Sequence, residues 1–308
     1  MQRMRCLALA TTLTTVRRAA AWSSACAPGP GRPAVRRAAT SSADSPAAPH
    51  DPSKPRSSRL RQHLNPLSQR WRTPIVLAHD YYDKMFAAPE HPLWLDIGSA
   101  KGGFAIDVAT ARGEINILGL EIRPEAVKFA LDRLARRGGP PNVAFLQCNA
   151  NVDLDSTLAP LADAATGEVP RLERVLLQFP DPHFKRRHRK RRVIDGLLVH
   201  TVAARLPQGG DICLTSDILE VAVELRAAFR AAKGFNEMRD DGGSGAGWLA
   251  ANTVGVPTER EVAVENNGLP VYRCRFVRNG EPVAADTIAV VDQAITDLRR
   301  FEKSPNPP

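Results

Sequence analysis

An isolated acid between two prolines, followed by a dense run of cations, is the feature of this sequence that most directly suggests chemistry. Asp181 lies between Pro180 and Pro182, and seven of the eight residues in 185–192 are Lys or Arg. The apolar run 174–179 predicts a buried strand that the prolines end. Asp181 is therefore expected at the carboxyl edge of a sheet, where open α/β folds bind their ligands.

The basic run, residues 185–192, suits a phosphate-bearing partner. Its cations can neutralise several phosphates, which provides affinity for nucleic acid without reading its sequence. The alternative interpretation is a solvated helix face or a localisation signal. The net charge of +9 does not decide between them, because residues 1–43 hold seven arginines and no Lys, Asp or Glu. Without those arginines the chain carries +2, so the basic run stands out against a nearly neutral background.

The first 57 residues are predicted to lie outside the folded domain. Residues 1–43 have the Arg-, Ala- and Ser-rich, acid-free composition of a mitochondrial or chloroplast transit peptide, and 27–57 is a Pro- and Ser-rich disordered linker. An organellar location is therefore expected, and a cytoplasmic one if this segment is not a transit peptide. The domain is expected to span 58–303, followed by a disordered tail at 304–308.

Composition argues against several other classes of protein. With 43% hydrophobic and 24% charged residues the chain is ordinary for a soluble globular protein. No segment approaches the roughly 20 apolar residues of a membrane-spanning helix. The five cysteines lie far apart, without a CxxC pair or a histidine at ligand spacing. This spacing predicts reduced structural thiols and neither a metal site nor a disulfide framework.

Alternating apolar and amphipathic segments predict a doubly wound, Rossmann-like α/β sheet with helices on both faces. The expected strands are 93–97, 115–121, 143–148, 174–179 and 211–216, with 248–252 and 271–277 as candidates for added antiparallel strands. The expected helices are 103–112, 124–137 and 218–232. Pro124 suits a first helical turn, because its missing N–H would be unsatisfied there anyway.

The first strand is followed by a turn of small residues, 96–103 (DIGSAKGG). Small residues such as Gly98 and Gly102 let the backbone approach a ligand, and the next helix offers free N–H groups to an anionic group. The turn departs from GxGxxG, since Ala100 stands at the middle glycine, and no GK[ST] follows that would make it a Walker A loop.

Polar residues end the next two strands, as expected for a nucleoside-binding edge. Glu121 ends the second strand, where such folds hydrogen-bond a ribose, and Asn149 with Ala150 follows the third, placed to meet an adenine edge. The same arrangement suits a dinucleotide oxidoreductase, or a tight connection without a ligand. Asp96, just before the turn, favours S-adenosylmethionine, whose amino group needs an acceptor there.

Together these segments resemble the tRNA (guanine-N7)-methyltransferase family, of the bacterial and organellar single-chain type, over roughly residues 59–278. The segments that carry the resemblance are 61–67 (RQHLNPL), 96–103, 119–121 (GLE), 179–185 (FPDPHFK) with the basic run, 215–217 (TSD), 257–261 (PTERE) and 268–272 (GLPVY). Departures are Asp96, where many members have Glu, Ala100, where Gly or Ser is usual, and His183-Phe184, which replaces a Trp-containing dipeptide as in plant and algal relatives.

The resemblance implies roles for the matching positions. Those implied to line the methyl-donor site are Asp96, Glu121, Asn149 and Asp181, the last also as the catalytic acid residue. Those implied to contact the tRNA substrate are Lys185, Arg187, Arg189, Lys190, Arg191, Arg192, Asp217, Thr258 and Glu261. The implied reaction moves a methyl group to N7 of guanine in the tRNA variable loop, at guanine-46.

The chemistry of guanine is consistent with such a set of residues. Guanine N7 has a lone pair and no proton, so methyl transfer to it needs positioning and no general base. The product is cationic, which a fixed carboxylate such as Asp181 can stabilise by about 3 kcal/mol. Guanine also offers N1–H and N2–H donors, from which the carboxylates of Asp217 or Glu261 can accept hydrogen bonds. Adenine has an acceptor at N1, which a carboxylate would repel.

Other interpretations of the same residues remain open at this stage. Asp217 suits a helix cap before Ile218, and Glu261 suits an ordinary surface acid. The histidines His63, His183 and His188 are expected to have structural or hydrogen-bonding roles. The chain as a whole also suits a methyltransferase for another nucleic-acid base, or a non-catalytic RNA-binding partner, although an intact Asp181 and Glu121 argue against the latter.

Overall fold

The computed structural model describes residues 64–78, 80–161, 171–239 and 247–301. The predicted transit peptide and linker at 1–57 and the predicted tail at 304–308 lie outside these described residues, as does His63.

A seven-stranded mixed sheet runs through the domain in the order β3-β2-β1-β4-β5-β7-β6. The first five strands in this order are parallel, and β7 pairs antiparallel with both β5 and β6. The strands are β1 (Leu93–Ile97), β2 (Asn116–Glu121), β3 (Val143–Gln147), β4 (Leu172–Gln178), β5 (Asp211–Ser216), β6 (Phe235–Met238) and β7 (Tyr272–Arg278).

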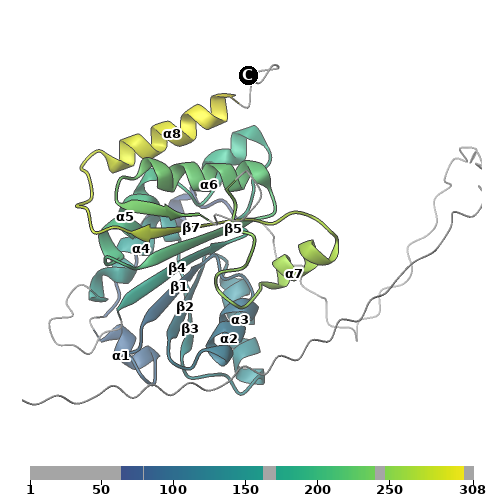
Figure 1. The fold of residues 1–308 in the computed structure, drawn as a ribbon. Coiled ribbons are helices and arrows are strands. Elements are labelled where there is room, and N and C mark those ends of the chain that lie inside the picture. Colours follow the sequence, from purple (N-terminus) through teal and green to yellow (C-terminus); the bar gives the residue numbers. More distant parts are fainter. Residues whose placement is uncertain (1–63, 79, 162–170, 240–246, 302–308) are drawn as a thin grey trace, which may run out of the picture. The chain divides into compact units, whose positions relative to one another are not determined.

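Helices cover both faces of this sheet, as Figure 1 shows. On one side lie α2 (Gly103–Ala111), α3 (Pro124–Arg136) and α7 (Glu259–Asn266); on the other lie α4 (Ala150–Leu158), α5 (Gly196–Arg205), α6 (Leu219–Ala231) and α8 (Thr287–Phe301). Shorter elements are α1 (Tyr81–Met85) and the 3-10 helices η1 (Gln69–Trp71), η2 (Ala159–Leu161) and η4 (Arg186–Arg191).

Burial on both faces explains why the central strands are continuous apolar runs. Every residue of β1, β2 and β5 is buried, as expected for parallel strands covered on both sides. Side chains alternate between two apolar clusters: Leu95 and Ile97 pack toward α4, α5 and α6, whereas Trp94 packs toward α2 and α3. This alternation decides which side chains of β1 lie on each face.

The α/β sheet predicted from the sequence is confirmed, and its five parallel strands lie within two residues of their predicted bounds. The prediction of a strand at 248–252 is wrong, because the backbone hydrogen bond from Leu249 N to Arg273 O does not continue into a ladder with β7. Trp248 is held instead by Arg226, whose guanidinium lies 4.5 Å from the centre of its ring. The short strand β6 was not predicted, because four residues of mixed polarity give no clear period.

Candidate active site

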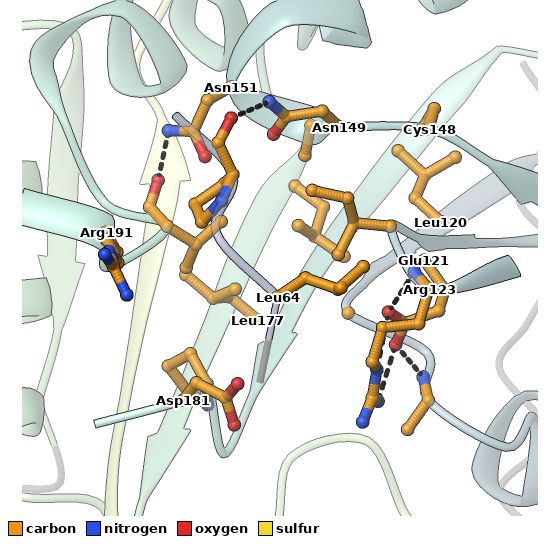
Figure 2. Close-up of a pocket in the computed structure, with 18 of the residues that line it drawn as sticks. Leu64, Leu120, Glu121, Arg123, Cys148, Asn149, Asn151, Leu177, Asp181 and Arg191 are labelled. Carbon is orange, nitrogen blue, oxygen red and sulfur yellow. Dashed lines mark hydrogen bonds and ion pairs between the residues drawn. The ribbon is translucent and has the colours of Figure 1, made fainter. Parts of the chain in front are cut away.

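A pocket of about 220 Å³ lies at the carboxyl edge of β1, β2, β3 and β4, where the loops after these strands meet (Figure 2). Residues singled out from the sequence that line it are Gly98, Ala100, Glu121, Asn149, Ala150, Asp181, His183 and Arg191. The apolar part of its wall comes from Leu64, Ile97, Leu120, Ile122, Leu177 and Val193. The pocket thus combines an apolar wall with a few polar groups, as ligand sites usually do.

The two predicted turn glycines have different roles. Gly98 has φ +87° and no atom within 4 Å of the position a Cβ would take, so it supplies a left-handed backbone and leaves the pocket open. Gly102 has φ +71°, but a Cβ there would lie 2.5 Å from the Phe145 ring. Gly102 therefore allows α2 to pack closely on β3, and it does not line the pocket. Between them Ala100 also has a positive φ, of 50°.

Glu121 is buried at the end of β2 and its oxygens point into the turn and toward Arg123 (Figure 2). Its Oε2 accepts from Ala100 N at 3.1 Å, and its Oε1 accepts from Arg123 N at 2.8 Å and Arg123 Nε at 3.0 Å. The hydrogen bonds that Arg123 donates to Glu121, and the charge of nearby Asp181, both raise the pKa of Arg123. Arg123 was missed in the sequence, although it follows the strand-ending acid by two residues.

Asp96 lies in the sheet beneath this site and does not line the pocket. It alternates with Leu95 and Ile97 and so faces α2. Burial, and next the charge of Glu121, raise the pKa of Asp96 to about 7. A carboxyl group with a pKa in this range becomes ionised readily when a cationic group is placed near it.

Asn149 is buried after β3, and its side-chain amide points away from the pocket, where a contact with an adenine edge was predicted. Its Nδ2 donates to Pro66 O at 3.1 Å rather than into the pocket, as Figure 2 shows. Leu64 and Pro66 line the pocket together with Asn149. Leu64 and Pro66 belong to segment 61–67, which contributed to the family resemblance. Its residue types did not indicate that it would lie against the strand ends.

Asp181 is exposed at the mouth of the pocket, in a loop of unusual backbone conformation. We refer to residues 179–183 as the Asp181 loop. Phe179 and His183 at its two ends have φ values of +47° and +43°, in the left-handed region that residues with a Cβ rarely adopt. Phe179 N donates to Thr215 O at 2.8 Å, which extends the β4–β5 pairing by one residue. The prediction that Asp181 lies at the carboxyl edge of the sheet is confirmed.

The cations of the basic run differ in exposure. Those that are exposed are Lys185, Arg186, Arg187 and Lys190. Arg189 lies 3.3 Å from Glu220, and Arg191 lines the pocket. Arg192 is buried and paired with Glu220 and Glu224. The implied role of Arg192 as an RNA contact is therefore corrected, because a phosphate could reach this guanidinium only by breaking its buried ion pairs.

The late Thr-x-x-Glu motif is part of the protein interior. Thr258 Oγ1 accepts from Glu261 N at 2.9 Å and Glu261 Oε2 accepts from Thr258 N at 3.3 Å, which is a capping box at the start of α7. Glu261 is 1% exposed and also accepts from Arg273 and Asn252. This arrangement contradicts a direct substrate contact for Glu261, and it is no surface acid either. The Thr-x-x-Glu spacing alone could have revealed the cap.

Asp217 follows β5 at the same edge of the sheet as the pocket. Its carboxylate accepts from Arg260 of α7 and does not cap α6, since Ile218 N bonds to Ser216 Oγ at 3.1 Å. The capping role considered for Asp217 is therefore wrong. Its side chain is 12% exposed, so the carboxylate is largely covered beside the N-terminal end of α7.

In the part of the chain that the structure describes, no group of His, Cys, Asp or Glu side chains is arranged to hold a metal ion, and Cys148, Cys213 and Cys274 are buried and unbridged. No helix among these residues has the length and apolar character needed to cross a bilayer.

Comparison with known proteins agrees with a methyltransferase. A family model described as "Putative methyltransferase" matches residues 90–274, which include all of β1 to β5 and the Asp181 loop. The parallel sheet with its carboxyl-edge pocket and this match define the chain as an α/β, Rossmann-like methyltransferase.

Curated relatives identify the family more narrowly. A tRNA (guanine-N(7)-)-methyltransferase of Synechococcus elongatus is 43% identical over 220 residues, covering 71% of this chain and 96% of the relative. One of Parasynechococcus marenigrum is 42% identical over 224 residues, covering 73% and 90% respectively. The chain belongs to the tRNA (guanine-N7)-methyltransferase family.

Solved structures are similar at a lower level. The antibiotic-resistance methyltransferase Kmr is 15% identical, with a TM-score of 0.41, covering 68% of this chain and 96% of that one. An rRNA methylase from Streptococcus thermophilus is 13% identical, with a TM-score of 0.37, covering 65% and 93%. The family assignment comes from the sequence relatives and the family model.

Proposed function

We propose that this protein transfers a methyl group from S-adenosylmethionine to N7 of a guanine in tRNA, at guanine-46 of the variable loop. The observation that carries the proposal is the place of Asp181, an exposed acid at the mouth of the carboxyl-edge pocket, with four exposed cations in the basic run that follows its loop. Membership of the tRNA (guanine-N7)-methyltransferase family supports both the substrate and the atom.

The pocket residues fit the proposed donor. Glu121, buried at a strand end where its oxygens accept from Ala100 N and Arg123 N, can exchange those bonds for the two hydroxyls of a ribose. Leu120, Ile122 and Leu177 form an apolar wall suited to an adenine ring. Asp96, buried behind the turn with its pKa raised to about 7, does not line the pocket, so we propose that it supports the turn and does not contact the donor itself. The donor supplies a methyl group on a cationic sulfur.

The protein's task in this reaction is to position the base and to stabilise positive charge. Guanine N7 has a free lone pair, so no side chain has to remove a proton from it. A carboxylate beside the purine stabilises the charge that develops on the ring, an effect of about 3 kcal/mol for one well-placed group. Asp181 is the group we assign to this role, because it is exposed at the pocket and its backbone is fixed by the end of β4.

The exposed cations and Asp217 are proposed to hold the tRNA. Lys185, Arg187 and Lys190 project from the loop and η4 beside Asp181, where contacts with phosphates would bring the substrate to the pocket. Asp217 at the end of β5 is proposed to accept from guanine N1–H or N2–H, with Arg260 released or shared. Thr258 would act indirectly on tRNA binding, because it caps the N-terminal end of α7, which carries Arg260.

The direct test is nucleoside mass spectrometry of tRNA incubated with the protein and methyl-labelled S-adenosylmethionine. We expect labelled 7-methylguanosine, and its loss when guanine-46 of the transcript is replaced by adenine. Label in another base would instead indicate a different base methyltransferase. Tight tRNA binding without transfer would indicate a non-catalytic partner, and tight NAD binding would indicate an oxidoreductase.

We also propose an organellar location, supported by the acid-free, Arg-rich composition of residues 1–43. A fluorescent protein fused after residue 57 should enter chloroplasts or mitochondria, and the fusion lacking residues 1–43 should remain in the cytosol. Cytosolic location of both fusions would refute the proposal.

A further inference from the structure

Glu224, a buried carboxylate in α6, joins parts of the chain that are far apart in sequence. Its side chain and that of its partner Arg192 are each only 2% exposed. Glu224 Oε2 accepts from Arg192 Nη1 at 2.6 Å and from Nε of Arg299, in α8, at 3.1 Å. One carboxylate therefore connects α6, the end of the basic run and the C-terminal helix.

Arg192 continues this network into the Asp181 loop. Its Nε donates to the carbonyl oxygen of Pro182 at 2.7 Å, while its other nitrogens bond to Glu224 and Glu220. Pro182 directly follows Asp181 and has no N–H of its own to anchor the loop. The bond from Arg192 is thus a fixed point between the loop and the domain interior.

The Asp181 loop needs such fixed points. The positive φ angles of Phe179 and His183 are sparsely populated for residues with a Cβ, and such conformations persist only where the surrounding structure imposes them. The bond from Phe179 N to Thr215 O holds the end of the loop nearest β4. The bond from Arg192 to Pro182 O holds the opposite end, one residue beyond Asp181.

The helix α8 takes part in this arrangement although it lies outside the residues matched by the family model, 90–274. Besides its bonds to Glu224, Arg299 Nη2 donates to the backbone oxygen of Arg189, at 3.3 Å, within η4. In Figure 1, α8 lies across α5 and α6 on the side of the sheet away from α2 and α3. The C-terminal helix is therefore bonded both to the buried carboxylate and to the basic run.

We propose that Arg192, Glu224 and Arg299 are positioning residues that hold Asp181 in its productive place, and that α8 is required for this. The proposal rests on the proposed function for its catalytic consequence. A buried ion pair contributes little to stability compared with apolar residues of the same size, but it fixes direction, because both partners must keep their hydrogen-bond geometry. Arg192 in particular needs its planar fork to bond Pro182, Glu220 and Glu224 at once.

Two variants test the network without removing bulk. Glu224→Gln keeps the shape of the side chain and removes its charge, and Arg192→Lys keeps the charge and removes the fork. For both we expect faster hydrogen–deuterium exchange in the peptide 179–185. We also expect the single-turnover methylation rate at saturating tRNA to fall about 10- to 100-fold, since a small misplacement of a catalytic group has this effect. Donor affinity by calorimetry should stay close to wild type.

The matched control is Glu237→Gln, which breaks the buried pair of Glu237 in β6 with Arg226 of α6; these side chains are 8% and 9% exposed. This variant should lower Tm as much as Glu224→Gln but leave both the exchange of 179–185 and the methylation rate unchanged. Equal effects of the two Gln variants, or unchanged exchange in Glu224→Gln and Arg192→Lys, would overturn the proposal.

A third variant covers the case in which Glu224→Gln fails to fold. Arg299→Ala, whose side chain is partly exposed, should give a smaller change of the same kind, about 3- to 10-fold in rate. A wild-type rate and wild-type exchange in Arg299→Ala would exclude α8 from the network. If the wild-type protein itself does not methylate tRNA, the proposed function fails, while the exchange measurements still decide whether the network holds the loop.

Discussion

Arg187 and Arg192 belong to one basic run, and the structure gives them opposite environments. Arg187 is exposed on η4, whereas Arg192 is buried against Glu220 and Glu224. The two acids Asp181 and Asp96 form a similar pair, one exposed at the pocket and the other buried in β1. In each pair the residue type is the same, and burial separates the group that can meet a ligand from the group that supports it.

Exposed and buried charged residues are therefore expected to affect different measured properties. Loss of an exposed charge should change binding or rate with little effect on stability. Loss of one partner of a buried pair should change stability strongly, because the remaining charge is left without compensation.

Replacing the exposed acid, Asp181→Ala, is expected to lower the single-turnover methylation rate by about 100- to 1000-fold, the loss usual for one electrostatic stabiliser of a transition state. tRNA affinity, measured by filter binding, should stay near wild type because the exposed cations are unchanged. A rate near that of wild type would remove Asp181 from the catalytic machinery.

Breaking the buried pair, Arg192→Ala, is expected to lower the free energy of unfolding by about 3 kcal/mol, because the buried Glu224 and its neighbour Glu220 each lose a cationic partner and keep Arg299 and Arg189 respectively. The matched exposed variant, Arg187→Ala, should change it by less than about 0.5 kcal/mol. Urea unfolding followed by circular dichroism measures both. Equal stability of the two variants would mean that burial does not separate these arginines.

Replacing four exposed cations with Ser is expected to weaken tRNA binding by about 10- to 100-fold at moderate salt. The residues replaced are Lys185, Arg186, Arg187 and Lys190. The slope of log affinity against log salt concentration should become shallower by about two to four, the number of phosphates that the variant no longer neutralises. Donor affinity should not change.

The control for this variant is a chain lacking residues 1–43, which removes seven arginines from another place. If this truncation weakens tRNA binding more than the four serines do, the N-terminal segment binds RNA and the transit-peptide interpretation is wrong.

Truncating the acid at the end of β2, Glu121→Ala, is expected to weaken S-adenosylmethionine binding by about 1 to 3 kcal/mol in calorimetry, the contribution of hydrogen bonds to a charged group. Glu121→Gln, which keeps an acceptor, should lose less. Arg123 also loses its partner in both variants, so Arg123→Ala serves as the control and should leave most of the affinity. Unchanged donor affinity in Glu121→Ala would refute the ribose assignment.

The smallest effect concerns the pH dependence of stability that arises from the buried acid Asp96. Its pKa of about 7 in the folded protein lies above the unfolded value of 3.8, so folding favours the protonated form. The resulting stability is complete below pH 3.8 and is lost as pH rises through about 7. Asp96→Asn, neutral at every pH, should therefore gain about 1 kcal/mol on wild type between pH 6 and 8. A difference that stays constant over this range would contradict the raised pKa.

The sheet and the pocket edge were accessible from the sequence because both depend on local patterns. Continuous apolar runs bounded by turns specify parallel strands covered on both faces, and the residues after those strands must share one edge. Glu121 and Asp181 are at the pocket for that reason. By contrast, Thr258 and Glu261 were assigned by resemblance, and the capping box that Thr-x-x-Glu also specifies was overlooked.

Partners distant in sequence were not accessible in this way. Nothing in the sequence relates Arg192 to Glu224 or Arg299, which lie 32 and 107 positions further along the chain, or Asn149 to the backbone of Pro66. These contacts form because α6, α8 and the segment before α1 pack on the completed sheet, which brings residues distant in sequence together. A hydrogen bond to a backbone carbonyl, such as that of Pro182, also leaves no mark in residue type.

Local residue patterns were enough to predict a doubly wound sheet, acids at its carboxyl edge, and a dense run of cations after one of them. Which of those charges are available to a ligand follows from the packing of the helices and loops around them. Charge is a property of the residue, whereas desolvation and pairing are properties of its surroundings. Arg192 and Asp96 were therefore indistinguishable from Arg187 and Asp181 until the helices and loops around them were in place.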